Sequence, residues 1–313
     1  MRIFKGIENL PEFRNAVFTT GTFDGVHTGH QEIIRRINRL STETGGENIL
    51  LTFHPHPRKV LHKDDSGLKL LNTLEEKIAL LSKYGVDNLV ITPFSKDFSM
   101  MSAEAYVKDF IWKKFHPRKV ALGFNHRFGN NRTGNLALMR EMGKKLGFEV
   151  DEIEAQTVEN ISVSSTKIRQ ALAKGELQTA NALLGHYYTL SGKVVSGEHM
   201  GKKLGFPTAN IKIQDEDKLI PANGVYAVLV RIDSITYGGM LNIGFRPTFN
   251  GTKQTIEVNI FDFSEDIYGA DIAVDLVSEI RKEVKFNSLH ELTAQLEKDK
   301  QRSLKILSTE KTN

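Results

Sequence analysis

The chain of 313 residues contains no cysteine. Disulfide bonds, thiolate metal sites and a cysteine nucleophile are therefore excluded, and any chemistry must use other side chains. No stretch approaches the roughly 20 apolar residues of a membrane span. The N-terminus also lacks an apolar run preceded by basic residues. These absences predict a cytoplasmic protein that works away from the membrane.

No charge of one sign dominates, because 42 lysines and arginines face 38 aspartates and glutamates. The hydrophobic fraction of 40% is that of an ordinary globular protein, and the length favours two domains. Aromatic residues make up only 8% of the chain, and no basic stripe is interleaved with them. These two features weigh against an RNA-binding protein with a barrel fold. The mildly basic charge balance leaves that class of protein as an alternative.

The first half of the chain alternates short apolar runs with segments of helical spacing. Ile33, Ile37 and Leu40 recur at the spacing of one helix face, and Thr73 with Glu76 has the spacing of a capping box. Strands separated by such helices predict a parallel sheet covered on both faces. We therefore predict a Rossmann-like α/β domain over residues 1–185, with strands at residues 16–20, 48–53, 88–94, 119–124 and 148–153.

After about residue 185 the pattern changes to period-two alternation punctuated by Gly, Pro and Asn. Closely spaced short strands of this kind predict a small antiparallel β-barrel. Ser288 and Glu291 have capping-box spacing, and Leu289, Leu292, Leu296 and Ile306 predict a final helix packed on the barrel. The second domain is expected over residues 186–313, with strands at residues 189–195, 208–213, 224–232, 236–244, 254–263 and 271–280.

The sharpest motif is GTFDGVHTGH at residues 21–30, between the first strand and the first helix. Its glycines allow close approach of backbone to phosphate, and the helix N-terminus offers unpaired N–H groups. His27 and His30 can stabilise charge on phosphate oxygens in a transition state. The motif supplies the catalytic candidates His27 and His30, and the ATP-binding candidates Gly21, Phe23, Asp24, Gly25 and Gly29.

A second element, VSSTKIRQAL at residues 163–172, begins with hydroxyl residues suited to a helix N-terminus. Ser164, Ser165 and Thr166 can meet phosphates there. Arg169 follows within the first turns and can bind phosphate oxygens with two hydrogen bonds. It is a candidate for holding the β- and γ-phosphates of ATP while pyrophosphate leaves.

Two loops contain further candidates, TFHPHPRKVL at 52–61 and LGFNHRFGNNRTGN at 122–135. The second follows a strand at the edge where doubly wound sheets bind ligands, and Asn125 is the favoured contact. We assign no metal to His54, His56 or His126, because acidic and thiolate partners at ligand spacing are missing.

The second domain opens with GKVVSGEHMGKKLGFPTAN at residues 192–210. Thr208 and Asn210 alternate on a strand, so a hydroxyl and an amide oxygen can together coordinate Mg²⁺ bridging the phosphates of ATP. Glu257 lies on the polar face of a later strand and can accept the proton of an alcohol. The candidates for ligand binding here are Gly197, Gly201, Lys203, Gly205, Phe206, Pro207 and Arg246, and the family resemblance described below implies that they bind ATP or flavin.

Residues 15–300 resemble the bacterial bifunctional riboflavin kinase and FMN adenylyltransferase family. The pairing of HTGH with SSTKIR resembles the nucleotidylyltransferase superfamily, while PTAN and the segment around Glu257 resemble riboflavin kinases. The resemblance implies that Glu257 is the catalytic base, that Mg²⁺ is the cofactor, and that ATP, riboflavin, FMN and FAD are the small-molecule partners. It implies neither a nucleic-acid nor an obligatory protein partner. His54 departs from the family, which commonly has an acid there.

Without the resemblance, the residues indicate only a phosphate-handling α/β domain followed by a barrel with an Mg²⁺ site. The alternative within the same class is a single-activity nucleotidylyltransferase whose barrel binds flavin as a regulatory module. Loss of PTAN or Glu257 would favour that alternative, and both are present.

Overall fold

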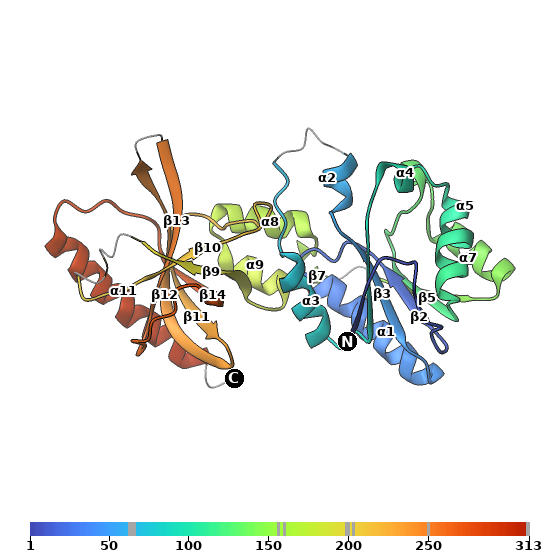
Figure 1. Cartoon of the computed structure of the whole chain (residues 1–313), viewed down its shortest axis with the longest axis horizontal. Coiled ribbons are helices and arrows are strands. Elements are labelled where there is room, and N and C mark those ends of the chain that lie inside the picture. The colour runs from blue at the N-terminus through green and yellow to red at the C-terminus, as the bar shows by residue number, and fades with distance from the viewer. Residues whose placement is uncertain are drawn as a thin grey trace. The chain divides into compact units, whose positions relative to one another are not determined.

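The computed structural model describes residues 1–61, 67–154, 157–158, 161–197, 201, 204–248 and 251–310. Its internal contacts form two compact units, residues 1–70 with 74–164 and residues 71–73 with 165–313. In Figure 1 the first unit is coloured mainly blue to green and the second mainly yellow to red. The division by contacts falls after Ser164, whereas the hydrophobic pattern changes near Gly185. The functional boundary between residues 185 and 186 therefore stays a prediction.

The first unit contains a six-stranded sheet in which every neighbouring pair is parallel. This confirms the Rossmann-like layout and the strands expected from the apolar runs. An additional edge strand was not predicted, because its sequence RIFK is short, mostly exposed and bounded by charges. The spatial order is β1 (Arg2–Lys5), β4 (Asn88–Thr92), β3 (Asn48–Phe53), β2 (Val17–Thr20), β5 (Lys119–Gly123) and β6 (Glu149–Ile153).

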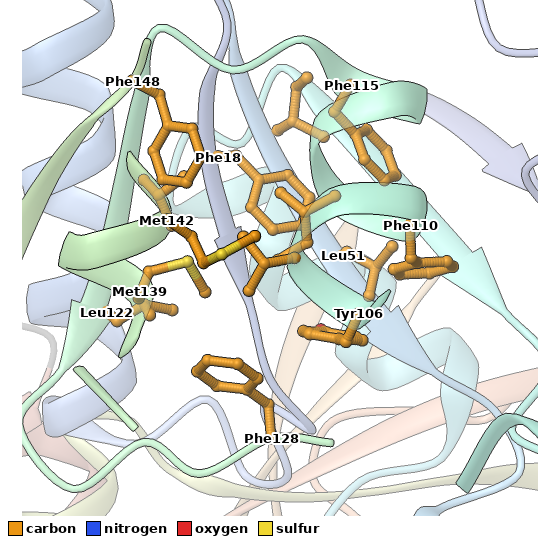
Figure 2. Close-up of a cluster of buried hydrophobic side chains, with 14 of the residues drawn as sticks. Phe18, Leu51, Tyr106, Phe110, Phe115, Leu122, Phe128, Met139, Met142 and Phe148 are labelled. Carbon is orange, nitrogen blue, oxygen red and sulfur yellow. The ribbon is translucent and has the colours of Figure 1, made fainter. Parts of the chain in front are cut away.

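Helices cover both faces of this sheet, because successive strand residues point to opposite sides. Leu50 of β3 joins Ile34 and Leu81 in one buried cluster, on the side of α1 and α3. Leu51 joins an aromatic-rich cluster on the other side, drawn in Figure 2 with Phe18 and Phe110. The helices of this unit are α1 (Thr28–Thr44), α2 (Pro57–Leu61), α3 (Leu74–Lys83), α4 (Lys96–Ser99), α5 (Ala103–Ala105), the π-helix η1 (Tyr106–Trp112), α6 (Lys113–Phe115), the 3₁₀-helix η2 (Asn130–Arg132) and α7 (Leu136–Leu146). Two short antiparallel strands follow, β7 (Thr157–Val158) and β8 (Ile161–Ser162).

The second unit is built around a closed antiparallel barrel, as the alternating pattern predicts. Closure leaves no free sheet edge. The order around the barrel is β10 (Ala209–Lys212), β13 (Gly251–Ile260), β12 (Ile235–Thr248), β11 (Gly224–Ile232), β14 (Asp271–Arg281) and β9 (Tyr188–Val195). Two helices precede the barrel, α8 (Ser165–Lys174) and α9 (Leu177–Leu184), and Asn181 of α9 donates to Leu276 O of β14 at 2.9 Å.

The final helix α11 (Leu289–Glu310) packs on the barrel and begins at the expected cap, where Ser288 Oγ accepts the Glu291 N–H at 3.2 Å. Asp299 is 1% exposed and pairs with Arg281 of β14, with Nη2 and Oδ2 2.8 Å apart. Leu289 does not pack as predicted, because it is 62% exposed in the first turn, before the helix reaches the barrel core. Within the described ranges, no helix has the length and apolar character needed to cross a membrane.

Candidate active sites

The glycine-rich turn begins where β2 ends, at the carboxyl edge of the parallel sheet. Gly21 N–H donates to Leu51 O at 3.0 Å, which extends the sheet hydrogen bonding into the turn. Gly25 adopts a φ of +87°, and the non-glycine residues Phe23 and Val26 also have positive φ, at +46° and +38°. Positive φ is uncommon outside glycine, so this turn holds an unusual conformation at the edge where such sheets bind ligands.

His27 and His30 form a stacked pair at the start of α1. His27 is the N-cap, and its Nδ1 accepts the backbone N–H of His30 at 3.3 Å. The two rings lie 3.6 Å apart between centroids, with planes 14° from parallel. A Cβ on Gly29 would lie 3.3 Å from the His27 ring, so glycine between the histidines lets the rings close up. The HTGH spacing therefore brings both imidazoles to the N-terminal end of the helix.

His30 is held neutral by its surroundings. Burial lowers its pKa well below the usual value, and the nearby His27 and Lys77 lower it further. Its Nδ1 is buried and has no hydrogen-bond partner among the described residues. A neutral imidazole with one unused nitrogen is suited to a hydrogen bond with a ligand at the turn.

Lys77 of α3 contacts the same turn and was not predicted from the sequence. Its side chain is 7% exposed, and Nζ donates to Thr22 O at 2.8 Å. Burial lowers the pKa of Lys77, while the buried carboxylate of Asp24 acts in the opposite direction. The available signal was its position on the apolar stripe of the helix, three residues after Leu74 and four before Leu81. A lysine on such a stripe must find a partner when it is buried.

The candidate residues of the two predicted loops differ in how firmly the structure holds their side chains. Asn125 and His54 are exposed. His56 is buried, and its Nδ1 accepts the backbone N–H of Arg58 at 3.2 Å, which stabilises the start of α2. A ligand role for Asn125 therefore stays a prediction.

The second predicted phosphate-binding element forms α8, which belongs to the second unit. Ser164 precedes the helix, Ser165 is its first residue, and Thr166 is exposed. Arg169 is half-buried in the second turn, next to the fully buried Ile168. The meeting of this helix with the histidine turn stays a prediction.

In the barrel, strand register brings the PTAN segment to the predicted base. Asn210 of β10 pairs directly with Glu257 of β13, so their side chains share one face. Thr208 is two residues from Asn210, and its Oγ1 donates to Glu257 Oε2 at 3.5 Å. Val258 lies on the opposite face of β13 and is fully buried. Residues almost fifty positions apart in the sequence thus form one polar cluster.

Two glycines keep the preceding loop close to this cluster. A Cβ on Gly197 would overlap the Asn210 side chain, and one on Gly201 would lie 3.1 Å from Thr208 Oγ1. Gly205 adopts a φ of +80° before the buried Phe206. Lys203 lies outside the described residues. The backbone of Arg246 pairs with Lys253 in the β12–β13 hairpin, but its side chain is outside the description.

Comparisons with known proteins identify a family for each part of the chain. Residues 10–167 match the FAD synthetase family and residues 184–307 match the riboflavin kinase family. The bifunctional riboflavin kinase/FMN adenylyltransferase of Listeria monocytogenes is 40% identical over 288 residues, which is 92% of this chain and 91% of the relative. The chain belongs to this bifunctional family. The resemblance inferred from the motifs is thereby confirmed.

Another member and a solved structure match nearly the whole chain. The Bacillus subtilis bifunctional riboflavin kinase/FMN adenylyltransferase is 36% identical over 95% of this chain and 94% of its own. The crystal structure of a macrolide-efflux protein from Streptococcus pneumoniae is 31% identical, with a TM-score of 0.87. It covers 97% of this chain and 99% of that one. The bifunctional family therefore shares this order of domains, and the S. pneumoniae protein shares the fold.

The barrel of this family member has a cavity beside the polar cluster. Its volume is about 330 Å³, and Asn259 and Pro207 lie on its wall. Asn259 Nδ2 donates to Pro207 O at 2.7 Å and so ties β13 to the segment that carries Thr208. Lys300 of α11 supplies a positive charge at the same cavity.

The cluster itself suits Mg²⁺. Thr208 supplies a hydroxyl oxygen and Asn210 an amide oxygen, with the carboxylate of Glu257 beside them. Mg²⁺ prefers hard oxygen ligands of this kind. A protein usually supplies only a few of them, and water and substrate phosphates supply the rest.

Proposed function

We propose that residues 1–185 transfer the adenylyl group of ATP to FMN and that residues 186–313 phosphorylate riboflavin. The two reactions give FMN with ADP, and then FAD with pyrophosphate. The observation that supports the kinase assignment is the register pairing of Asn210 with Glu257, because a carboxylate then lies beside an amide oxygen on one face of the barrel. Incubation with riboflavin, ATP and Mg²⁺, followed by chromatography of the flavins, tests it. Absence of both FMN and FAD would refute the proposal.

In the kinase site, Glu257 accepts the proton of the terminal ribityl hydroxyl as that oxygen attacks the γ-phosphorus of ATP. Thr208 and Asn210 would hold Mg²⁺, which when bound would neutralise charge on the phosphate oxygens. The cavity beside Pro207 and Asn259 accepts the nucleoside part of ATP. Gly197 and Gly201 allow the loop backbone to lie close to the phosphates.

In the adenylylation site, the phosphate of FMN attacks the α-phosphorus of ATP, and pyrophosphate leaves. His27 and His30 donate hydrogen bonds to the oxygens on which charge develops, and the N–H groups at the start of α1 add to this stabilisation. Arg169 binds the β- and γ-phosphates and Asn125 contacts ATP. Positioning and electrostatics supply the catalysis, with no covalent intermediate on the enzyme.

We expect that removal of Mg²⁺ stops both reactions, because each moves a phosphorus centre whose charge these side chains only partly neutralise. Excess EDTA should abolish formation of FMN from riboflavin and of FAD from supplied FMN, and added Mg²⁺ should restore both. Full turnover in EDTA would contradict a magnesium requirement.

We expect Lys77→Met to shift the acid limb of the adenylylation pH profile to higher pH. The ammonium lowers the pKa of His30, so its removal raises that pKa, and His30 becomes protonated at a higher pH. Protonation disrupts the stacked pair on which the turn depends. The matched control is Lys83→Met, which removes an exposed lysine from the end of the same helix. Coincident profiles for the two variants would contradict this role of Lys77.

We propose that the enzyme works in the cytoplasm, where ATP is available, and that its reactions need no nucleic acid, membrane or obligatory protein partner. The nearly balanced charge of the chain supports this proposal, because nucleic-acid binding relies on concentrated basic surface. Addition of RNA should leave the rates of both reactions unchanged.

A further inference from the structure

His126 lies in the loop that follows β5, at the carboxyl edge of the parallel sheet. The backbone N–H of His126 donates to the carbonyl oxygen of Gly123, the last residue of β5, at 2.9 Å. Its ring lies 6.0 Å from that of Phe128, with planes 31° apart. The backbone turn and the neighbouring ring therefore fix where this imidazole lies.

A row of rings connects His126 to the strand that carries the glycine-rich turn. Phe128 is buried, and its ring lies 5.4 Å from that of Tyr106, which Figure 2 shows beside it. Tyr106 Oη is 3.3 Å from Thr20 Oγ1, and Thr20 is the last residue of β2 before Gly21. These contacts thus connect His126, through Phe128 and Tyr106, to the strand that ends at the glycine-rich turn.

The Nε2 atom of His126 is buried without a hydrogen-bond partner among the described residues. Buried polar atoms in folded proteins are nearly always paired, so an orphaned one needs an explanation. Burial, and to a smaller extent the charge of Arg132, lowers the pKa of His126 to about 4. The imidazole is therefore neutral at pH 7, and it can form a hydrogen bond with an uncharged polar group without burying a charge.

We infer that His126 determines specificity in the adenylylation site by forming a hydrogen bond, through Nε2, with a heteroatom on the edge of a substrate's heteroaromatic ring. The buried rings of Phe128 and Tyr106 near His126 keep water away, which strengthens a hydrogen bond between uncharged partners. Two substrates carry a heteroaromatic ring, the isoalloxazine of FMN and the adenine of ATP. This inference rests on the proposed adenylylation activity of the first domain.

The test measures FAD formation from supplied FMN by the wild type and by His126→Phe, His126→Gln and His126→Asn. The Phe variant keeps a ring but removes both nitrogens, and the loss of one hydrogen bond should raise the KM for one ring-bearing substrate by about 5- to 30-fold. We expect kcat and the KM for the other substrate to stay near wild type. A raised KM for FMN identifies the flavin ring, and a raised KM for ATP identifies adenine.

The Gln and Asn variants distinguish a ligand contact from a packing role. The amide of glutamine reaches the position of Nε2, whereas that of asparagine reaches only Nδ1, so Gln should restore the affinity and Asn should not. Failure of Gln to restore affinity, unchanged KM values in the Phe variant, or equal loss of kcat with lower thermal stability in all three would overturn the inference.

The wild type run in parallel separates this inference from the proposed function. If the wild type makes no FAD from FMN, the proposed function is wrong. Calorimetric titration of the same variants with FMN, and separately with ATP, then decides the role of His126. Equal dissociation constants across wild type, Phe, Gln and Asn for both ligands would refute it.

Discussion

Glu257→Gln is expected to lower the rate of riboflavin phosphorylation by about 10²- to 10⁴-fold, the usual contribution of general-base catalysis. Conversion of supplied FMN to FAD should continue at the wild-type rate. The substitution preserves side-chain size and the polar face of β13, but it removes the proton acceptor that lies beside Thr208. The opposite face, including the fully buried Val258, is unaffected.

Glu265→Gln is the matched control, because Glu265 is exposed in the loop after the same strand. It should leave both reactions unchanged. Riboflavin phosphorylation by Glu257→Gln within a few-fold of wild type would mean that Glu257 is an ordinary polar residue of the strand. Loss of FAD formation as well, with an unchanged circular dichroism spectrum, would mean that the two sites are not separate.

The second large effect is expected for His30→Ala, which should lower FAD formation by about 10²- to 10³-fold, the cost of losing one donor to a transition-state oxyanion. FMN formation from riboflavin should stay at the wild-type level. The variant removes the imidazole stacked on His27 while keeping a good helix former in the first turn of α1. Separate assays of the two half-reactions give both rates.

Arg169→Ala tests whether α8 works with the histidine turn, and it should follow the same pattern as His30→Ala. His290→Ala is the control, because His290 is exposed on α11 of the barrel unit. If His30→Ala and Arg169→Ala reduced FMN and FAD formation equally, a shared site or misfolding would replace the two-site account.

The strands of the first unit could be predicted because both faces of the sheet are buried. Runs such as NILLTF are buried throughout and mostly apolar, since Leu50 packs against one layer of helices and Leu51 against the other. The edge strand β1 could not be recognised in this way, because it is mostly exposed and Arg2 and Lys5 bound it. Leu289 shows the opposite error. The predicted helix is present, but its first turn extends beyond the barrel surface on which the helix packs, so Leu289 is exposed.

The candidate sites were predicted where local geometry decides them. The HTGH spacing alone brings His27 to the N-cap and His30 to the first turn of one helix, and PTAN gives Thr208 and Asn210 the alternate spacing that puts two side chains on one side of an extended chain. The meeting of Asn210 with Glu257 depends on the register between β10 and β13, which the sequence of neither strand determines. Lys77 was missed because its role depends on the carbonyl of Thr22, which only the folded turn brings within reach.

The most direct test of two separate sites is to mix the Glu257→Gln and His30→Ala variants with riboflavin, ATP and Mg²⁺ and to follow the flavins by chromatography. Alone, Glu257→Gln should leave riboflavin unconverted, and His30→Ala should stop at FMN. The mixture should produce FAD, because FMN made by one variant is adenylylated by the other. Suppose that Glu257→Gln adenylylates supplied FMN but the mixture makes FMN and no FAD. That result would contradict free transfer of FMN between separate sites. A mixture that makes neither FMN nor FAD would contradict the assignment of the sites.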